Sequence, residues 1–216
     1  MHRRGGLCEP RTVLRVSHDL SMRAFYDAEL PNRSGPPPGS ERLLQRQEFI
    51  DACRAEGLRS VLEVGCGAGH DGMALNAAGL RYGGSDLSAV GAALCGGRGL
   101  PAVQASATRL PFPDHSFDAA WTMSTLMHLP GDDIEVALAE LGRVVRPAGL
   151  IEIGVWGADD SSTRIDELGR YFRHRTDAEL RELLSGVGEV TAFRTWDRLP
   201  SSSHYQWARV RAGGPS

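Results

Sequence analysis

Three glycines stand at alternate positions after a short apolar run, a spacing that lets a ligand approach the backbone. The run covers residues 60–64, and the glycines are Gly65, Gly67 and Gly69. Glycine has no Cβ, so the chain can turn sharply and present its N–H groups to a bound group. The pattern after the loop predicts a helix, whose N-terminus favours a carboxylate or a phosphate. A simple reversal of the chain direction also uses glycine, so the interpretation as a ligand-binding loop needs support from other residues.

Polar residues follow the next strands in the same way. Asp86 ends the second predicted strand, 17 residues after Gly69, and its carboxylate can accept hydrogen bonds from both hydroxyls of a ribose. Ser106 and Ala107 follow the third strand, and Asp118 stands on the fourth. Ligands of open parallel sheets bind at the carboxyl ends of the strands. We therefore expect one extended nucleoside ligand to reach all of these positions.

A histidine after the fourth strand is the candidate general base. His128 lies in the segment 124–130, and an unperturbed histidine has a pKa of about 6.5, which suits proton transfer near neutrality. The alternative is that His128 only shapes the pocket. The other histidines and the four cysteines show no metal-ligand spacing, so no metal site is predicted.

Strands and helices that alternate along the chain must position these residues. Seven short runs read as strands, over residues 60–64, 81–85, 101–105, 117–123, 150–155, 190–196 and 204–210. Their alternation with helical patterns predicts an α/β fold with a Rossmann-like, doubly wound, mostly parallel seven-stranded sheet. The last two runs have no helix between them, which places an antiparallel strand near one edge.

The chain divides into three predicted parts. Residues 1–16 read as a flexible leader. Residues 17–57 read as a helical cap, with a first helix capped by Ser17 or Asp19, a proline-rich loop over 31–39 and a second helix over 41–56. Residues 58–212 form the α/β domain that carries the candidate site.

The amino-acid composition excludes several classes of α/β enzyme. The 216 residues carry a net charge of −3, and every one of the 24 basic side chains is arginine. Without lysine there is no Walker-A lysine and no Schiff-base lysine. No secretory signal or membrane-length apolar run is found, which predicts a soluble cytoplasmic protein without a membrane partner. The acidic balance gives no reason to expect a nucleic-acid partner.

Four segments together resemble the motifs of class I S-adenosylmethionine-dependent methyltransferases of the type 11-like kind. They are VLEVGCGAG (61–69), GSDLS (84–88), ASATRLPFPDHSFD (105–118) and LGRVVRPAGL (141–150). Their order and spacing make the resemblance specific over residues 58–156. The resemblance implies S-adenosyl-L-methionine as the cofactor.

The family's roles can be carried over to the matching residues at the methionine end of that cofactor. The loop from Gly65 through Cys66 to Gly69 would lie against the methionine and ribose portion. Glu63 and the backbone of Met123 would hold the amino group. His70 would lie near the carboxylate, and Tyr26 of the first helix could reach it.

At the adenosine end, Asp86 would bind the ribose hydroxyls and Leu87 would pack on the adenine. Ser106 and Ala107 would meet the adenine edge. Many relatives carry an acidic residue where Ser106 stands, and serine accepts a hydrogen bond less strongly, so this contact is the weakest of the set.

A dinucleotide cofactor is the main alternative, because it also requires glycines followed by an acidic residue. Here the loop reads G-x-G-x-G rather than G-x-G-x-x-G, and no dehydrogenase-like set of catalytic residues is visible. The downstream motifs favour the methyltransferase interpretation.

The sequence therefore predicts an enzyme, monomeric or homodimeric, that methylates an oxygen or nitrogen of a small molecule. Its arginine-only composition is typical of actinobacterium-like sources, in which such enzymes often act in secondary metabolite and antibiotic biosynthesis. The alternatives are an RNA or protein methyltransferase, or a cofactor-binding scaffold that has lost catalysis.

Overall fold

The computed structural model describes residues 11–32, 39–197 and 203–213, with side chains described from residue 18. None of the described helices is long and apolar enough to cross a membrane. The first helix, α1 (Arg11–Glu29), begins six residues before the predicted start at residue 17. Residues 11–16 contain no glycine or proline to stop a helix, so Ser17 lies inside α1 rather than capping it. Residues 1–10 of the predicted leader lie outside the described residues.

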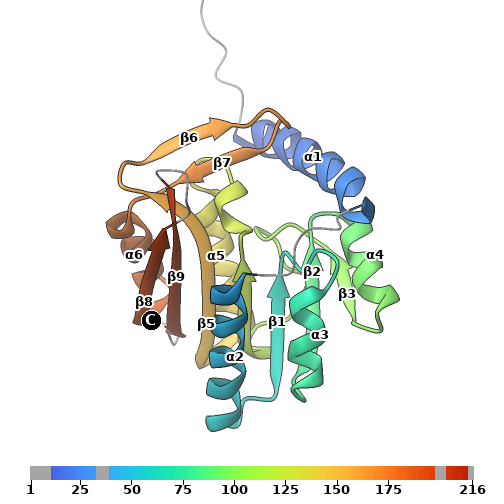
Figure 1. The fold of residues 1–216 in the computed structure, drawn as a ribbon, viewed down its shortest axis with the longest axis vertical. Coiled ribbons are helices and arrows are strands. Elements are labelled where there is room, and N and C mark those ends of the chain that lie inside the picture. Colours follow the sequence, from blue (N-terminus) through green and yellow to red (C-terminus); the bar gives the residue numbers. More distant parts are fainter. Residues whose placement is uncertain (1–10, 33–38, 198–202, 214–216) are drawn as a thin grey trace, which may run out of the picture.

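A seven-stranded sheet forms the centre of the molecule, in the order β3-β2-β1-β4-β5-β9-β8 (Figure 1). The strands are β1 (Ser60–Val64), β2 (Arg81–Asp86), β3 (Ala102–Gln104), β4 (Phe117–Met123), β5 (Val145–Ala158), β8 (Gly188–Asp197) and β9 (Ser203–Ala212). β9 pairs antiparallel with both β5 and β8, while the pairings among β1 to β5 are parallel. The predicted Rossmann-like sheet, with its antiparallel strand near one edge, is confirmed.

Helices cover both faces of this sheet. They are α2 (Ser40–Ala55), α3 (His70–Ala77), α4 (Ala89–Gly97), α5 (Asp133–Val144) and α6 (Asp177–Ser185). α2, α3 and α4 contribute to one buried cluster, around Phe49, Leu75 and Trp121. α5 and α6 contribute to the other, around Leu138 and Leu180. All five residues of β1 are buried, as expected for a parallel strand covered on both faces.

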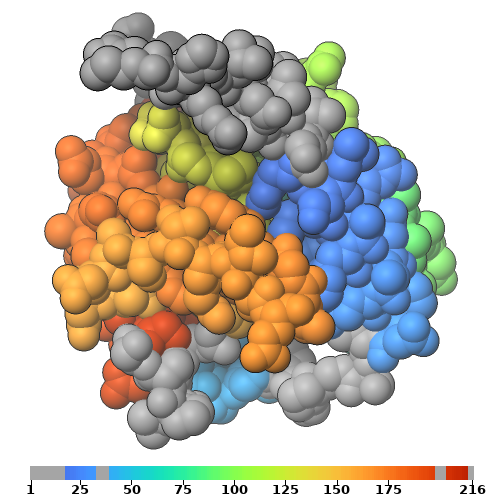
Figure 2. Space-filling view, turned by 90° about the horizontal axis from the view of Figure 1, so that it is seen from above, coloured from blue at the N-terminus to red at the C-terminus, as the bar shows by residue number. Residues whose placement is uncertain are grey.

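The carboxyl ends of the parallel strands are covered by α1 and by a hairpin that the sequence did not predict. The hairpin consists of β6 (Ser162–Ile165) and β7 (Tyr171–His174), which pair antiparallel. Figure 2, which looks down on this end, shows α1 and the hairpin side by side. The Arg170 guanidinium lies 5.3 Å from the ring of Phe25, and the His18 and Tyr171 rings meet edge to face. Two short 3₁₀ turns, η1 (Leu30–Asn32) and η2 (Leu126–His128), complete this end.

Asp118 does not lie at the carboxyl end of its strand, which corrects the prediction that groups it with the ligand-facing residues. It is the second residue of β4 and therefore lies at the amino end of the strand, opposite to the end that carries the glycine loop. Its Oδ2 accepts hydrogen bonds from the backbone N–H groups of Arg59 and Ser60 and from Ser60 Oγ. Its Oδ1 accepts one from Arg146 Nε at 2.8 Å. Asp118 therefore joins the starts of β1, β4 and β5.

We expect Asp118→Ala to destabilise the fold by about 1–3 kcal/mol, because it leaves several backbone and side-chain donors without their acceptor. The free energy of unfolding in urea measures this loss. Cofactor affinity should stay unchanged, since the residue lies at the far edge of the sheet. A variant that keeps its stability but loses ligand affinity would contradict this assignment.

Candidate functional site

The glycine loop after β1 has a backbone that other residues adopt only with strain. The φ angles of Gly65, Gly67 and Gly69 are 80°, 49° and 79°, all in the left-handed region. At Gly65 a Cβ would also lie 2.0 Å from Thr125 Oγ1 of the segment after β4. Gly65 is therefore required both by its conformation and by the close approach of Thr125.

Asp86 ends β2 and lies beside this loop, as predicted. Its Oδ2 accepts a hydrogen bond from the Gly67 N–H at 2.7 Å, and its Oδ1 accepts one from the Ser88 N–H at 2.8 Å. Burial raises the pKa of Asp86, and the two N–H groups partly oppose that shift. The sheet thus brings the predicted ribose-binding carboxylate into contact with the predicted loop, across the β1–β2 pairing.

The remaining adenosine-side residues follow the ends of β2 and β3. Leu87, Ser106 and Ala107 are all half-buried. Gln104 Nε2 donates to the Leu87 carbonyl at 3.2 Å, and Ser106 Oγ lies 3.0 Å from Thr108 Oγ1. Their contacts with adenine stay predictions.

Glu63 lies behind the loop. Its buried carboxyl accepts a hydrogen bond from Tyr82 Oη at 2.6 Å. Burial raises the pKa of Glu63 well above its usual value, and the nearby charge of Asp71 raises it further. Its carboxyl thus faces Tyr82 inside the core, and its predicted role toward an amino group stays a prediction.

Three further predicted residues lie around the loop. Cys66 belongs to the loop, and its side chain is buried. His70 is exposed at the first position of α3, where its Nδ1 lies 3.3 Å from Arg98 Nη1. Met123 ends β4, and its carbonyl accepts a hydrogen bond from Thr125 Oγ1 at 3.2 Å. The structure therefore places Met123 at the same sheet edge as Gly65 and Asp86.

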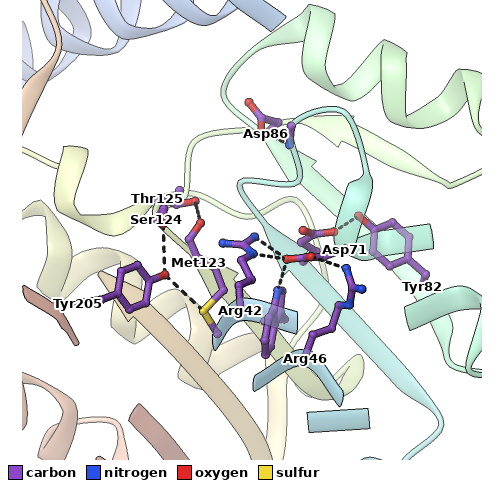
Figure 3. A network of polar contacts seen from close by, with 12 residues as sticks. Arg42, Arg46, Asp71, Tyr82, Asp86, Met123, Ser124, Thr125 and Tyr205 are labelled. Carbon is purple, nitrogen blue, oxygen red and sulfur yellow. Dashed lines mark hydrogen bonds and ion pairs between the residues drawn. The ribbon is translucent and has the colours of Figure 1, made fainter. Parts of the chain in front are cut away.

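A buried carboxylate with two arginines lies beside the loop, and no pattern in the sequence predicted it (Figure 3). Asp71, in the first turn of α3, accepts hydrogen bonds from Arg42 Nε, Arg46 Nη1 and Trp121 Nε1, each at 2.9 Å. Burial alone would raise the pKa of Asp71, but Arg42, Trp121 and Arg46 together hold it below its usual value. The partners are separated by 25 to 50 residues, so no local pattern could predict them.

His128 and Tyr26, which the sequence assigned to different roles, contact each other. His128 Nδ1 lies 2.7 Å from the Tyr171 carbonyl, and its Nε2 lies 2.9 Å from Tyr26 Oη. A carbonyl can only accept, so Nδ1 carries the hydrogen and Nε2 accepts from the Tyr26 hydroxyl. Tyr26 thus contacts the candidate base, and its predicted contact with the cofactor carboxylate stays a prediction.

The surroundings keep His128 neutral. Burial lowers its pKa to about 4, and the Tyr171 carbonyl only partly opposes this shift. The Phe172 ring meets the imidazole at 4.6 Å and stacks on Trp156 at 5.2 Å, while the Arg170 guanidinium lies 5.1 Å from the Phe172 ring. Nε2 is therefore unprotonated at neutral pH, but a pKa of about 4 makes it a weaker base than the unperturbed histidine that the sequence predicted.

The central part of the chain is similar in sequence to known methyltransferases. The model of a methyltransferase domain matches residues 62–153. The fatty-acid O-methyltransferase of Mycolicibacterium smegmatis is 44% identical over 101 residues, which are 44% of this chain and 35% of that protein. The phthiotriol/phenolphthiotriol dimycocerosates methyltransferase of Mycobacterium tuberculosis is 33% identical over 147 residues, 61% of this chain and 52% of that protein. The chain thus spans about half or less of the length of these relatives.

Comparison with solved structures supports the fold over almost the whole chain. The 1,6-didemethyltoxoflavin-N1-methyltransferase of Burkholderia thailandensis, crystallised with 1,6-didemethyltoxoflavin and S-adenosylhomocysteine, superposes with a TM-score of 0.71. The two share 21% identity, and the match covers 98% of this chain and 94% of that one. At this identity the likeness concerns the architecture.

The low pKa of His128 predicts a measurable loss of stability in acid. Unfolded His128 takes up a proton near pH 6.5, whereas the folded residue does so only near pH 4, so the unfolded state binds more protons between these values. The contribution of His128 to the free energy of unfolding should therefore fall by about 2 kcal/mol from pH 7 to pH 5. Urea unfolding of wild type and His128→Gln at both pH values isolates it. Equal pH dependence in the two proteins would show that folded His128 titrates normally.

Proposed function

We propose that residues 62–153, which match the model of a methyltransferase domain, bind S-adenosylmethionine, and that the chain methylates an oxygen or nitrogen of a small molecule. The contact between the Asp86 carboxylate and the Gly67 N–H carries the proposal. It joins the loop and the carboxylate at one edge of the sheet, where an extended nucleoside ligand would meet both.

The chemistry of these groups fits S-adenosylmethionine. The cofactor supplies an activated methyl group on a sulfonium. The carboxylate of Asp86 is a pure acceptor and suits the two ribose hydroxyls. The glycine loop lets the backbone meet the ligand closely, and the Met123 carbonyl can accept from its amino group. Arg42, which the sequence did not single out, offers a cation for its carboxylate.

His128 would act on the acceptor molecule. Its Nε2 accepts a hydrogen bond from the Tyr26 hydroxyl, and an acceptor hydroxyl or amine that replaces Tyr26 would find the same unprotonated nitrogen. His128 would then take the acceptor's proton, and the Tyr171 carbonyl would stabilise the resulting imidazolium through Nδ1. Burial of this region under α1 and the hairpin helps to exclude water.

The comparisons support a small-molecule or lipid acceptor, since the two relatives are named for fatty-acid and phthiotriol-type substrates. The proposal extends to a protein acting in the cytoplasm, in secondary metabolite biosynthesis, as a monomer or homodimer. In this scheme residues 17–57 cap the domain formed by residues 58–212. The hairpin residues Phe172 and Arg170 would form part of the acceptor pocket, together with Trp156.

Calorimetric binding is the direct test of the cofactor assignment. We expect the wild type to bind S-adenosylmethionine and not NADH. Asp86→Ala should weaken that affinity by about 10-fold to 100-fold, because a charged acceptor is lost. Asp114→Ala is the matched control, because it makes the same substitution at an exposed aspartate. Preference for NADH, or unchanged affinity in Asp86→Ala, would overturn the assignment.

His128→Gln should lower kcat by about 100-fold to 10,000-fold, while the affinity for S-adenosylmethionine stays within twofold. Transfer of a labelled methyl group can be followed on a panel of phenols, amines, hydroxy lipids and tRNA. His115→Asn is the control, because His115 is exposed and its φ of 55° suits asparagine. Undiminished turnover would leave His128 with only a pocket-shaping role, and transfer to tRNA alone would overturn the small-molecule proposal.

A further inference from the structure

A cavity lies between α5, α6 and the hairpin, and the described residues that line it include none that the proposed cofactor site uses. Its volume is about 740 Å³, within the range of small-molecule sites in proteins. The two helices and the end of β7 border it (Figure 1). Tyr171 lines the cavity and also gives its carbonyl to His128 Nδ1, so the cavity adjoins the proposed acceptor region.

Two arginines line this cavity at its hairpin end. Arg175 follows β7 directly and is 7% exposed, and its Nη2 donates to the Gly131 carbonyl at 3.3 Å. Arg173 of β7 is half-buried, and its Nη1 donates to Thr163 Oγ1 at 3.3 Å. Among the residues that the structure describes, no carboxylate oxygen lies within 4.0 Å of either guanidinium.

The burial of Arg175 is unusual for this chain because no carboxylate balances it. Arg46 and Arg209 are half-buried, and they pair with Asp71 and Glu152. An arginine keeps its charge at all ordinary pH values, so burial without an anion costs free energy. In agreement with this, burial lowers the pKa of Arg175, and the neighbouring charge of Arg173 lowers it further. The arrangement therefore favours an anion in the cavity.

The carboxylates that line the cavity lie nearer to solvent than Arg175. Glu179 is half-buried and already bonded, since its Oε2 accepts hydrogen bonds from the Thr176 N–H at 2.9 Å and from Ser161 Oγ. The other three are exposed, namely Asp132, Glu135 and Glu182. The charges of Glu179 and Asp132 oppose the lowering of the Arg175 pKa but do not cancel it. The buried end of the cavity is thus cationic.

The wall between the two helices is apolar. Ile134 and Leu138 of α5 are 1% and 2% exposed, and Leu183 and Val187 of α6 are half-buried. All four belong to the buried cluster on this face of the sheet or pack against it, so the fold holds them in place. A cationic end beside an apolar wall suits a molecule with an anionic head and an apolar body.

We propose that this cavity binds an anionic amphiphile, whose carboxylate or phosphate head pairs with Arg175 and Arg173 and whose apolar body lies against Leu138 and Leu183. Guanidinium groups bind both kinds of head through paired N–H donors. The inference goes beyond the proposed function and does not rest on it, because binding in this cavity requires neither the cofactor nor methyl transfer.

Calorimetry with octanoate, octyl phosphate, octanol and acetate tests the site. We expect the wild type to bind octanoate or octyl phosphate at one site, and the tighter of the two identifies the head. Octanol lacks the charge and acetate lacks the apolar body, so each should bind at least about tenfold more weakly. Binding of neither anion, or equal affinity for octanol and the anions, would overturn the inference.

Substitutions in the cavity locate the bound anion. Arg175→Gln and Arg173→Gln should each weaken the preferred anion by about tenfold and leave octanol unchanged, because each removes a charged donor. Ala139→Trp should weaken the anion and octanol alike, since Ala139 is an exposed wall residue at which an indole would fill part of the cavity. Arg173→Gln and Ala139→Trp decide the question if Arg175→Gln does not fold.

Arg181→Gln is the matched control, because Arg181 lies on α6 over the Phe193 ring and is not among the residues that line the cavity. Its affinity for the anion should stay within twofold of the wild type. Anion binding that the cavity substitutions leave unchanged, or that Arg181→Gln weakens as much as they do, would place the ligand elsewhere and overturn the inference.

Discussion

The parallel pairing of β1 with β2 on one side and β4 on the other is the constraint on which the site depends. Val64 pairs with Ser85, and Glu63 pairs with Trp121, so the three strands end at the same edge. This register brings the glycine loop, Asp86 and the segment after Met123 together. A slip of one residue would turn the buried side chains of β1 to the wrong faces and separate these groups.

Buried charge beside the loop adds a second level of organisation. Asp71 is almost fully buried and is stable as an anion only because two arginines and an indole N–H surround it. The same arrangement holds Arg42 at the ligand edge. Thus one carboxylate joins α2 to α3 through two ion pairs and sets the charge beside the proposed cofactor site.

Polar contacts join α1, the turn η2 and the hairpin strand β7 over the carboxyl ends of the parallel strands, although these elements are distant in sequence. His128 bonds to Tyr26 of α1 and to Tyr171 of β7, and His18 Nε2 lies 2.8 Å from the His128 carbonyl. These contacts make the protonation of His128 depend on the position of α1 and of the hairpin. If either opened, water would reach the imidazole and its pKa would rise toward the ordinary value.

The sequence by itself determined the seven strands, the left-handed glycines and the carboxylate at the end of β2, because each follows from a local pattern of apolar spacing or residue type. Local patterns misplaced the start of α1 and the end of β4 at which Asp118 lies, and they did not predict the hairpin of β6 and β7. Only the tertiary structure decided that Arg42 meets Asp71, that Tyr26 meets His128 and that Arg175 meets the Gly131 carbonyl. These partners are 29, 102 and 44 positions apart, and their pairing follows from strand order and packing, which no short stretch of the chain encodes.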